Sequence, residues 1–249
     1  MSATAFSSGD GAAAGALTLA LDASTYAGSV AVLRGASVVA EREVAMRGER
    51  AERMMPAVAD ALAAAGGGIA AVDRVVCGAG PGSFTSLRIA ASIAKGVAQG
   101  RGVPLLAVSS LTLVVAGAAD ALLAGRYLVA TDAMRGDWYA AMFELTPGGS
   151  VLERGAPGIV AGVDALRSLA AREGAVLVGP AWERPGGGPP LAPRAAGVAR
   201  LLVAGDAAAL LPVELASWEP SYGRLAEAQV KWEAAHGRAL SPTSASSGG

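Results

Sequence analysis

RVVCGAGPGSFTSLRIAASIAK, residues 74–95, predicts a strand, a glycine turn and a helix in direct succession. Val75, Val76 and Cys77 form a short apolar run that ends at Gly78, and Ser83 stands at the N-cap position of the helix. Beyond Ser83, apolar residues recur at helical spacing on two sides, with small residues between them. We therefore expect two faces of this helix to be buried.

The glycine turn itself has two interpretations. A turn that feeds a helix N-terminus presents backbone N–H groups at the positive end of the helix dipole, which suits a phosphate or a carboxylate, so Gly80, Gly82 and Ser83 are candidates for anion binding. The motif lacks the Gly-Lys-Ser/Thr of a Walker A loop, and Ser83 stands where a dinucleotide fingerprint has its third glycine. The other interpretation is a tight strand-to-helix connection without a ligand.

Composition excludes several classes of protein. The chain has 249 residues, of which 53% are hydrophobic and 16% charged, so it can bury a substantial core. The net charge of -1 lacks the basic footprint of an independent nucleic-acid binder, so a role on RNA would need a partner. A single cysteine excludes an intrachain disulfide, and a single histidine argues against a His-rich zinc site. We expect a cytoplasmic protein that does not enter a membrane.

The beginning of the chain predicts three strands joined by short turns between residues 16 and 44. Asp22, Ser24 and Thr25 follow the first strand, at the edge where open α/β sheets tend to bind ligands. Asp22 is a candidate for orienting a metal-bound phosphate or a water. Equally, it can be an Asx-turn acid that holds its own loop.

A helix is expected over residues 49–65, with its apolar side chains on one face. Methionines and small residues form adaptable contact surfaces, so this helix is a candidate for docking a partner protein. The simpler alternative is that Met54 and Met55 cover the sheet.

The second half begins with a strand over residues 126–131 that ends in Asp132 and turns into a second strand over 137–145. Together with the first half, this pattern suggests two related α/β lobes, each with an aspartate at a strand end. The expected divisions are a tail at 1–15, a first lobe at 16–113, a second and reduced lobe at 114–218, an extended piece and helix at 219–238, and a tail at 239–249.

Four motifs resemble the TsaB (YeaZ) family, which takes part in bacterial threonylcarbamoyladenosine modification of tRNA. They are LALDAST at 19–25, GAGPGSFTSLR at 78–88, AKG at 94–96 and TDAMRGDWYA at 131–140, and EPSY at 219–222 resembles the family's Pro-x-Tyr element. The resemblance implies an actin-like (ASKHA, ribonuclease H-like) two-lobed α/β fold, with mixed sheets flanked by helices. It covers residues 16–145 well and the middle of the second lobe only loosely.

The resemblance also implies a non-catalytic role. The catalytic relative, TsaD, carries a His-x-x-x-His metal pair, and Ser110 and Val114 stand at the corresponding positions. Neither side chain replaces an imidazole ligand, so we expect no catalytic residue and no metal site in this chain.

The family further implies a heterodimer with TsaD, binding of TsaE, a homodimer when the chain is alone, and tRNA contact only through the complex. No tightly bound cofactor is expected, although ATP or ADP with magnesium can occupy a complex interface. The two helices of the first lobe would form the partner surface. Its expected residues are Met54, Met55, Val58, Leu62, Phe84, Leu87, Ala91 and Ala94.

Three functions follow from these observations. The leading hypothesis is a scaffold, required with TsaD and TsaE, for forming N6-threonylcarbamoyladenosine at position 37 of tRNAs reading ANN codons. The alternative is an ATPase or small-molecule kinase of the same fold that uses Asp22, Asp132 and the glycine turn. A peptidase is the least supported, because Ser83 lacks the Gly-x-Ser-x-Gly context of a nucleophile, Cys77 lacks an activating base, and His236 lies near a tail.

Overall fold

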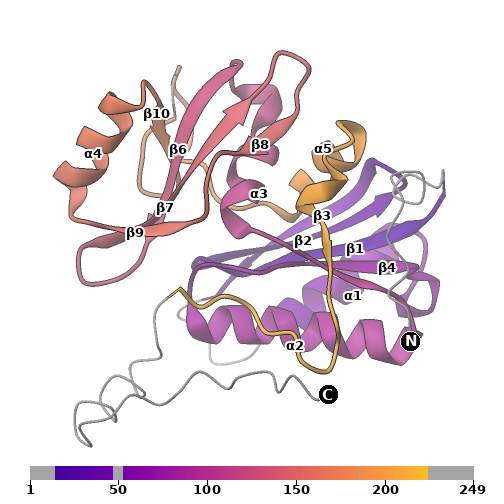
Figure 1. Cartoon of the computed structure of the whole chain (residues 1–249). Coiled ribbons are helices and arrows are strands. Elements are labelled where there is room, and N and C mark those ends of the chain that lie inside the picture. The colour runs from indigo at the N-terminus through magenta and orange to yellow at the C-terminus, as the bar shows by residue number, and fades with distance from the viewer. Residues whose placement is uncertain (1–14, 47–52, 185, 224–249) are drawn as a thin grey trace, which may run out of the picture.

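A computed structural model describes residues 15–46, 53–184 and 186–223, and every element named below lies within these ranges. The chain forms two sheets, each belonging to one lobe, with helices packed on their faces (Figure 1). The predicted helix near residues 225–235 lies outside the described residues.

A six-stranded sheet in the order β11-β5-β4-β1-β2-β3 forms the first lobe. Its strands are β1 (Leu17–Asp22), β2 (Ala27–Arg34), β3 (Ser37–Ala45), β4 (Arg74–Gly78), β5 (Leu105–Val108) and β11 (Leu211–Pro212). The first three strands form an antiparallel meander, whereas β4 and β5 run parallel to β1. Parallel pairing places Leu21 beside Cys77 and Gly78 beside Val108. The carboxyl ends of β1, β4 and β5 therefore meet at one edge.

The second lobe is a five-stranded sheet in the order β10-β6-β7-β8, with β9 also paired to β7. Its strands are β6 (Gly125–Asp132), β7 (Asp137–Leu145), β8 (Val151–Glu153), β9 (Gly158–Ala161) and β10 (Val176–Val178). The predicted hairpin is confirmed as the antiparallel pair β6–β7. Two mixed sheets with crossover helices confirm the expected actin-like α/β fold.

Helices cover the faces of these sheets (Figure 1), and three hydrophobic cores lie between helices and sheets. One core lies between the first sheet and the helices α1 (Met54–Ala64) and α2 (Phe84–Arg101). A second core joins the two lobes around α3 (Ser110–Ala116) and α5 (Val198–Val203). The third lies under α4 (Val163–Arg172), on the outer face of the second sheet. No helix in the described ranges is long and apolar enough to cross a membrane.

Small residues set how closely α2 approaches the first sheet. Ala90, Ala94 and Ala98 are fully buried, and Ser83 occupies the predicted N-cap position. The helix ends at Gly102, whose φ of 65° is the left-handed conformation that glycine adopts at low cost. The sequence therefore predicted where this helix begins and that it has buried faces, but not which of its side chains the sheet covers.

The end of α3 differs from the expectation. The apolar pattern of residues 111–123 predicts one helix, but α3 ends at Ala116 and a short 3-10 turn follows at Ala119–Ala121. The cause is a distant segment: a Cβ on Gly117 would stand 2.8 Å from Arg194 Cβ, and a Cβ on Gly197 would stand 2.7 Å from the Gly117 nitrogen. The returning chain thus packs directly against the end of α3.

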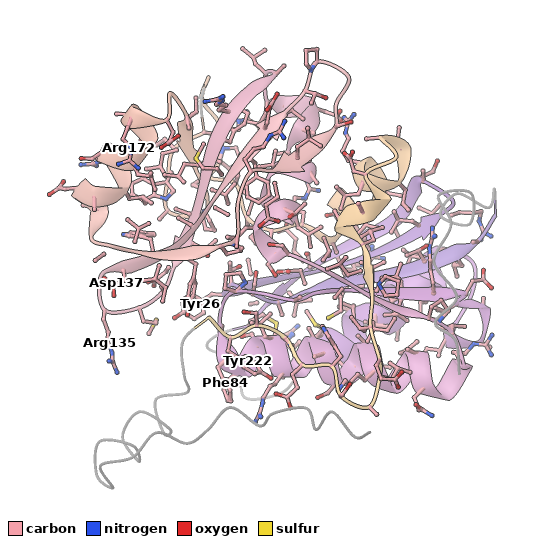
Figure 2. All side chains as sticks on the ribbon, viewed as in Figure 1. Tyr26, Phe84, Arg135, Asp137, Arg172 and Tyr222 are labelled. Atoms are coloured by element: carbon pink, nitrogen blue, oxygen red, sulfur yellow. The ribbon has the colours of Figure 1, made fainter. Side chains whose placement is uncertain are left out.

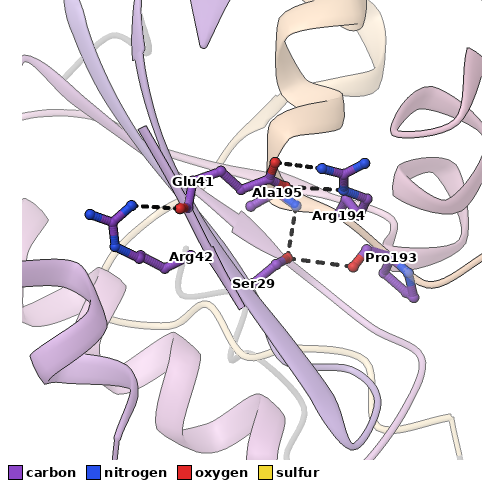
Figure 3. A network of polar contacts seen from close by, with 6 residues as sticks. All are labelled: Ser29, Glu41, Arg42, Pro193, Arg194 and Ala195. Atoms are coloured by element: carbon purple, nitrogen blue, oxygen red, sulfur yellow. Dashed lines mark hydrogen bonds and ion pairs between the residues drawn. The ribbon is translucent and has the colours of Figure 1, made fainter. Parts of the chain in front are cut away.

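That returning chain also corrects the expected division at residues 114–218. Residues 193–212 pack on the first lobe, since β11 pairs with β5 and the 3-10 helix η4 (Ala195–Gly197) lies against β2. Figure 3 shows the anchor: Arg194 forms an ion pair with Glu41, and Ser29 Oγ accepts the Ala195 N–H at 2.8 Å. A two-residue strand carries too little periodicity to reveal this pairing in the sequence.

Candidate functional site

The carboxyl edge of the first sheet brings Asp22, at the end of β1, next to the glycine turn and the start of α3. Asp22 is completely buried, and its Oδ1 accepts the Ser24 N–H at 2.9 Å and the Ser24 hydroxyl at 2.8 Å. Its Oδ2 accepts the Ser110 hydroxyl at 2.6 Å. Burial raises the pKa of the Asp22 carboxyl above its ordinary value of 3.8, against the opposite effect of these hydrogen bonds. Both carboxylate oxygens are therefore engaged inside the protein.

Glycine is required where the turn meets this carboxylate. A Cβ on Gly78 would stand 1.9 Å from Asp22 Oδ2. On the other side of the turn, a Cβ on Gly82 would stand 2.1 Å from the Ser24 carbonyl oxygen. The glycines thus let two backbone segments and a buried carboxylate pack together.

Three N–H groups of the turn have acceptors in the chain itself. The Ala79 N–H donates to Val108 O at 2.7 Å, and the Gly80 N–H donates to Ser110 Oγ at 3.0 Å. The Ser83 N–H donates to Ser24 O at 2.8 Å. A phosphate at this turn would have to compete for all three donors, so the geometry fits a tight connection better than an anion cradle.

The remaining candidates for ligand binding also make local contacts. The Thr25 hydroxyl donates to Ala27 O at 2.9 Å, and Asp132 is exposed and accepts the Met134 N–H at 2.7 Å. Asp132 opens the β6–β7 turn, in which Met134 and Arg135 both adopt left-handed backbone angles, with φ of 67° and 60°. These contacts are Asx-type and ST-type turns, which hold loops in place.

Three of the positions considered for nucleophilic or metal chemistry are buried. Cys77 is fully buried, and burial together with the Asp22 carboxylate raises the pKa of its thiol, so the reactive thiolate is disfavoured. Ser110 and Val114, at the positions of the relative's histidines, are both buried. No group of three or more His, Cys, Asp or Glu side chains with metal-binding geometry occurs within the part of the chain that the structure describes.

The expected partner surface on α1 and α2 needs a correction. Six of its residues point into the protein core rather than toward solvent: Met54, Val58, Leu62, Leu87, Ala91 and Ala94. Met55 is half-buried, and Phe84 is 36% exposed. The resemblance assigned these apolar residues to a partner, whereas Met54 lies against the sheet, as the simpler alternative had it.

The outward side of these helices carries small side chains instead. Ala59 and Ala63 of α1 are exposed, as are Ser92 and Gly96 of α2. Half-buried Met55, Ile89 and Ile93 belong to the same pair of helices. We call these seven residues the α1–α2 surface. The exposed residues of the same two helices also include Asp60 and Arg88, so small, apolar and charged side chains are all available here for contact with another protein.

Two contributors to this region were missed by sequence reasoning. Ser110 closes the hydrogen bonds around Asp22, although 88 positions separate the two residues. Tyr222 reaches the start of α2, where its ring packs on Phe84 with centroids 4.6 Å apart (Figure 2). The EPSY motif at 219–222 marked the second segment but not its position.

Comparison with known proteins adds sequence and structural relatives. A family model described as "TsaD: tRNA N6-adenosine threonylcarbamoyltransferase" matches residues 43–174. The tRNA threonylcarbamoyladenosine biosynthesis protein TsaB of Escherichia coli is 38% identical over 126 residues, which cover 51% of this chain and 54% of that protein. The match thus spans about half the length of this curated relative.

Two solved structures from Pseudomonas aeruginosa match over their full lengths. An uncharacterized protein with similarity to peptidase YeaZ has a TM-score of 0.68 and 31% identity, and the match covers 84% of this chain. YeaZ has a TM-score of 0.66 and 29% identity, with 83% of this chain covered. At 83–84% of the chain, these matches extend through both lobes, beyond the motifs of the first.

Proposed function

Because the chain belongs to the TsaB (YeaZ) family, whose domain is related to that of TsaD, we propose that it is a non-catalytic scaffold subunit of a tRNA threonylcarbamoyladenosine complex. Its partners would be TsaD and TsaE, and its role would be to support formation of N6-threonylcarbamoyladenosine at position 37 of tRNAs reading ANN codons. Contact with tRNA would occur through the complex, in keeping with the net charge of -1.

The observation that carries this proposal is the α1–α2 surface. Ala59, Ala63, Ser92 and Gly96 are exposed and small, so a partner helix can approach the backbones closely. A surface of this kind serves a TsaD subunit, and in its absence a second copy of the chain. By contrast, Asp22 and three turn N–H groups are already engaged within the chain, which argues for a structural rather than a catalytic role.

Calorimetry with the cognate TsaD tests the proposal. The parent chain should bind, and Ser92→Arg should weaken binding about tenfold or more, about 1.4 kcal/mol, because the large side chain would clash with a closely approaching partner and leave its charge unpaired. Ser168→Arg provides the matched control, since Ser168 is an exposed serine on α4 of the other lobe. Absence of binding by the parent, or equal loss in both variants, would refute the proposed surface.

A reconstituted modification reaction tests the role itself. Cognate TsaD, TsaE and an unmodified tRNA should give the modified nucleoside only when this chain is added. The Ser92→Arg variant should lose this effect in proportion to its loss of TsaD binding. Modification at the full rate without the chain would exclude the scaffold role.

We assign any ATP or ADP with magnesium to the assembled complex rather than to the isolated chain. The competition for turn N–H groups supports this assignment. Equilibrium dialysis of the isolated chain should give no saturable binding at millimolar nucleotide. Tight binding with turnover would instead favour the ATPase or kinase alternative.

A further inference from the structure

Residues 211–223, which we call the belt, run along the outside of the first lobe before reaching the second (Figure 1). The belt begins as β11 on the edge strand β5, and the Val213 N–H extends this pairing by donating to Leu105 O at 3.1 Å. It then passes α2, where Leu215 and Trp218 pack against the core of the first lobe. A cavity of about 420 Å³ remains between the belt and α2, lined by residues that include Lys95 and Leu215.

The belt is next fixed to the glycine turn. The Ser221 N–H donates to Ala79 O at 2.7 Å. Its carbonyl lies so close to Gly80 that a Cβ there would stand 2.2 Å from Ser221 O. The adjoining Tyr222 ring packs on Phe84, and Arg88 Nε donates to the Tyr222 hydroxyl at 3.4 Å. This part of the belt therefore covers the turn and the N-terminal end of α2.

The end of the described belt contacts the second lobe. The Tyr139 hydroxyl, on β7, donates to Tyr222 O at 3.0 Å. A Cβ on Gly223 would stand 2.3 Å from Tyr139 Cε1, so the ring and the belt backbone are in close contact. Tyr139 is itself 5% exposed, which fixes its ring in the second lobe. One short segment thus bonds to the glycine turn on one side and to β7 on the other.

We propose that the belt is a latch that holds the two lobes at one fixed angle. The belt is bonded to the glycine turn of the first lobe and to β7 of the second, so relative motion of the lobes would change the distance between these two attachments. A segment attached at Ala79 and at Tyr139 opposes that motion. The latch goes beyond the scaffold role, because it concerns the rigidity of the isolated chain and not its partner.

Hydrogen exchange measured by NMR tests the attachment to the second lobe. Tyr139→Phe removes one hydroxyl and leaves the ring in place, so exchange of the Ser221 N–H should accelerate about fivefold, the factor for one net hydrogen bond. Tyr127→Phe is the matched control, because its hydroxyl also donates to a backbone oxygen, Leu123 O at 2.6 Å, and does so away from the belt. An unchanged Ser221 rate in Tyr139→Phe, or equal acceleration in both variants, would overturn the latch.

Distance measurement by pulsed electron spin resonance tests the angle between the lobes in the full chain. Spin labels on Ala59→Cys in α1 and Ser168→Cys in α4 report on opposite lobes, and buried Cys77 stays unlabelled. Gly223→Ala should broaden the distance distribution, whereas Gly205→Ala should not. The two glycines share a φ of 71°, but a Cβ at Gly205 meets nothing within 4 Å.

The width of the distance distribution decides whether the belt sets the angle between the lobes. A broad distribution already in the parent, or an identical narrow one in Gly223→Ala, would show that the belt does not set the angle between the lobes. Binding of TsaD through the α1–α2 surface is measured independently, so failure of the latch and failure of the scaffold role are distinguishable. Should Gly223→Ala not fold, Tyr139→Phe in the same labelled background replaces it.

Discussion

Replacing Gly82 by alanine should destabilise the protein, because the new Cβ has no room beside the Ser24 backbone. The new Cβ would stand 2.1 Å from the Ser24 carbonyl oxygen, which must then move by roughly 1.3 Å to reach an ordinary contact. The same oxygen accepts the Ser83 N–H at 2.8 Å, so the movement also breaks a hydrogen bond at the start of α2. Overpacking costs about 1–3 kcal/mol and the hydrogen bond about 1 kcal/mol. The free energy of unfolding should fall by about 2–4 kcal/mol.

The matched control is Gly96→Ala, whose effect should have the opposite sign. Gly96 is exposed in the interior of α2, and a Cβ there meets nothing within 4 Å outside its own helix. Alanine is favoured over glycine at such a position by about 0.8–1 kcal/mol. Urea unfolding monitored by circular dichroism measures both variants. A Gly82→Ala variant within about 0.5 kcal/mol of the parent would refute the close packing of the turn against the Ser24 backbone.

Three further predictions concern the buried carboxylate and its neighbours. Ser110→Ala removes the hydroxyl between Asp22 Oδ2 and the Gly80 N–H and should lower the free energy of unfolding by about 1–3 kcal/mol in urea titrations, whereas a loss below about 0.5 kcal/mol would contradict the network. Burial raises the folded-state pKa of Asp22, so the contribution of this carboxyl to the free energy of unfolding is fully present below pH 3.8 and is lost as pH rises through the folded pKa. Over that rise Asp22→Asn should gain stability relative to the parent. Parallel plots of the free energy of unfolding against pH for the two proteins would exclude the shift. Cys77 should react with a thiol reagent only after unfolding, and rapid labelling of the native protein would contradict its burial.

Local signals in the sequence predicted much of the first lobe. The apolar run 75–77, the glycines after it and the N-cap at Ser83 defined β4, the turn and the start of α2 to within about a residue. The hairpin at 125–145 was equally clear, although its turn places Met134 and Arg135 in left-handed conformations that glycine or asparagine would adopt more readily. These elements depend on neighbours in the chain, which is why the pattern was sufficient.

Contacts between distant segments could not be predicted in the same way. Periodicity identified the apolar positions on α1 but could not decide whether they cover the sheet or face a partner; the resemblance favoured a partner, and Met54 and Val58 lie in the core. The hydrogen bond from Ser110 to Asp22 depends on the parallel alignment of β1, β4 and β5. The belt has almost no regular structure, and the residues that hold it lie in both lobes.

The belt also bears on what the glycine turn can still bind. A ligand that reached the turn would have to displace Ser221 from Ala79, and with it the attachment of Tyr222 to Tyr139. Two net hydrogen bonds correspond to about 2 kcal/mol, which would weaken the apparent affinity of such a ligand about thirtyfold. The α1–α2 surface carries no such penalty, because Ala59, Ser92 and Gly96 are already exposed. The same segment that closes the turn therefore favours binding on the outer face of α2 over binding at its N-terminus.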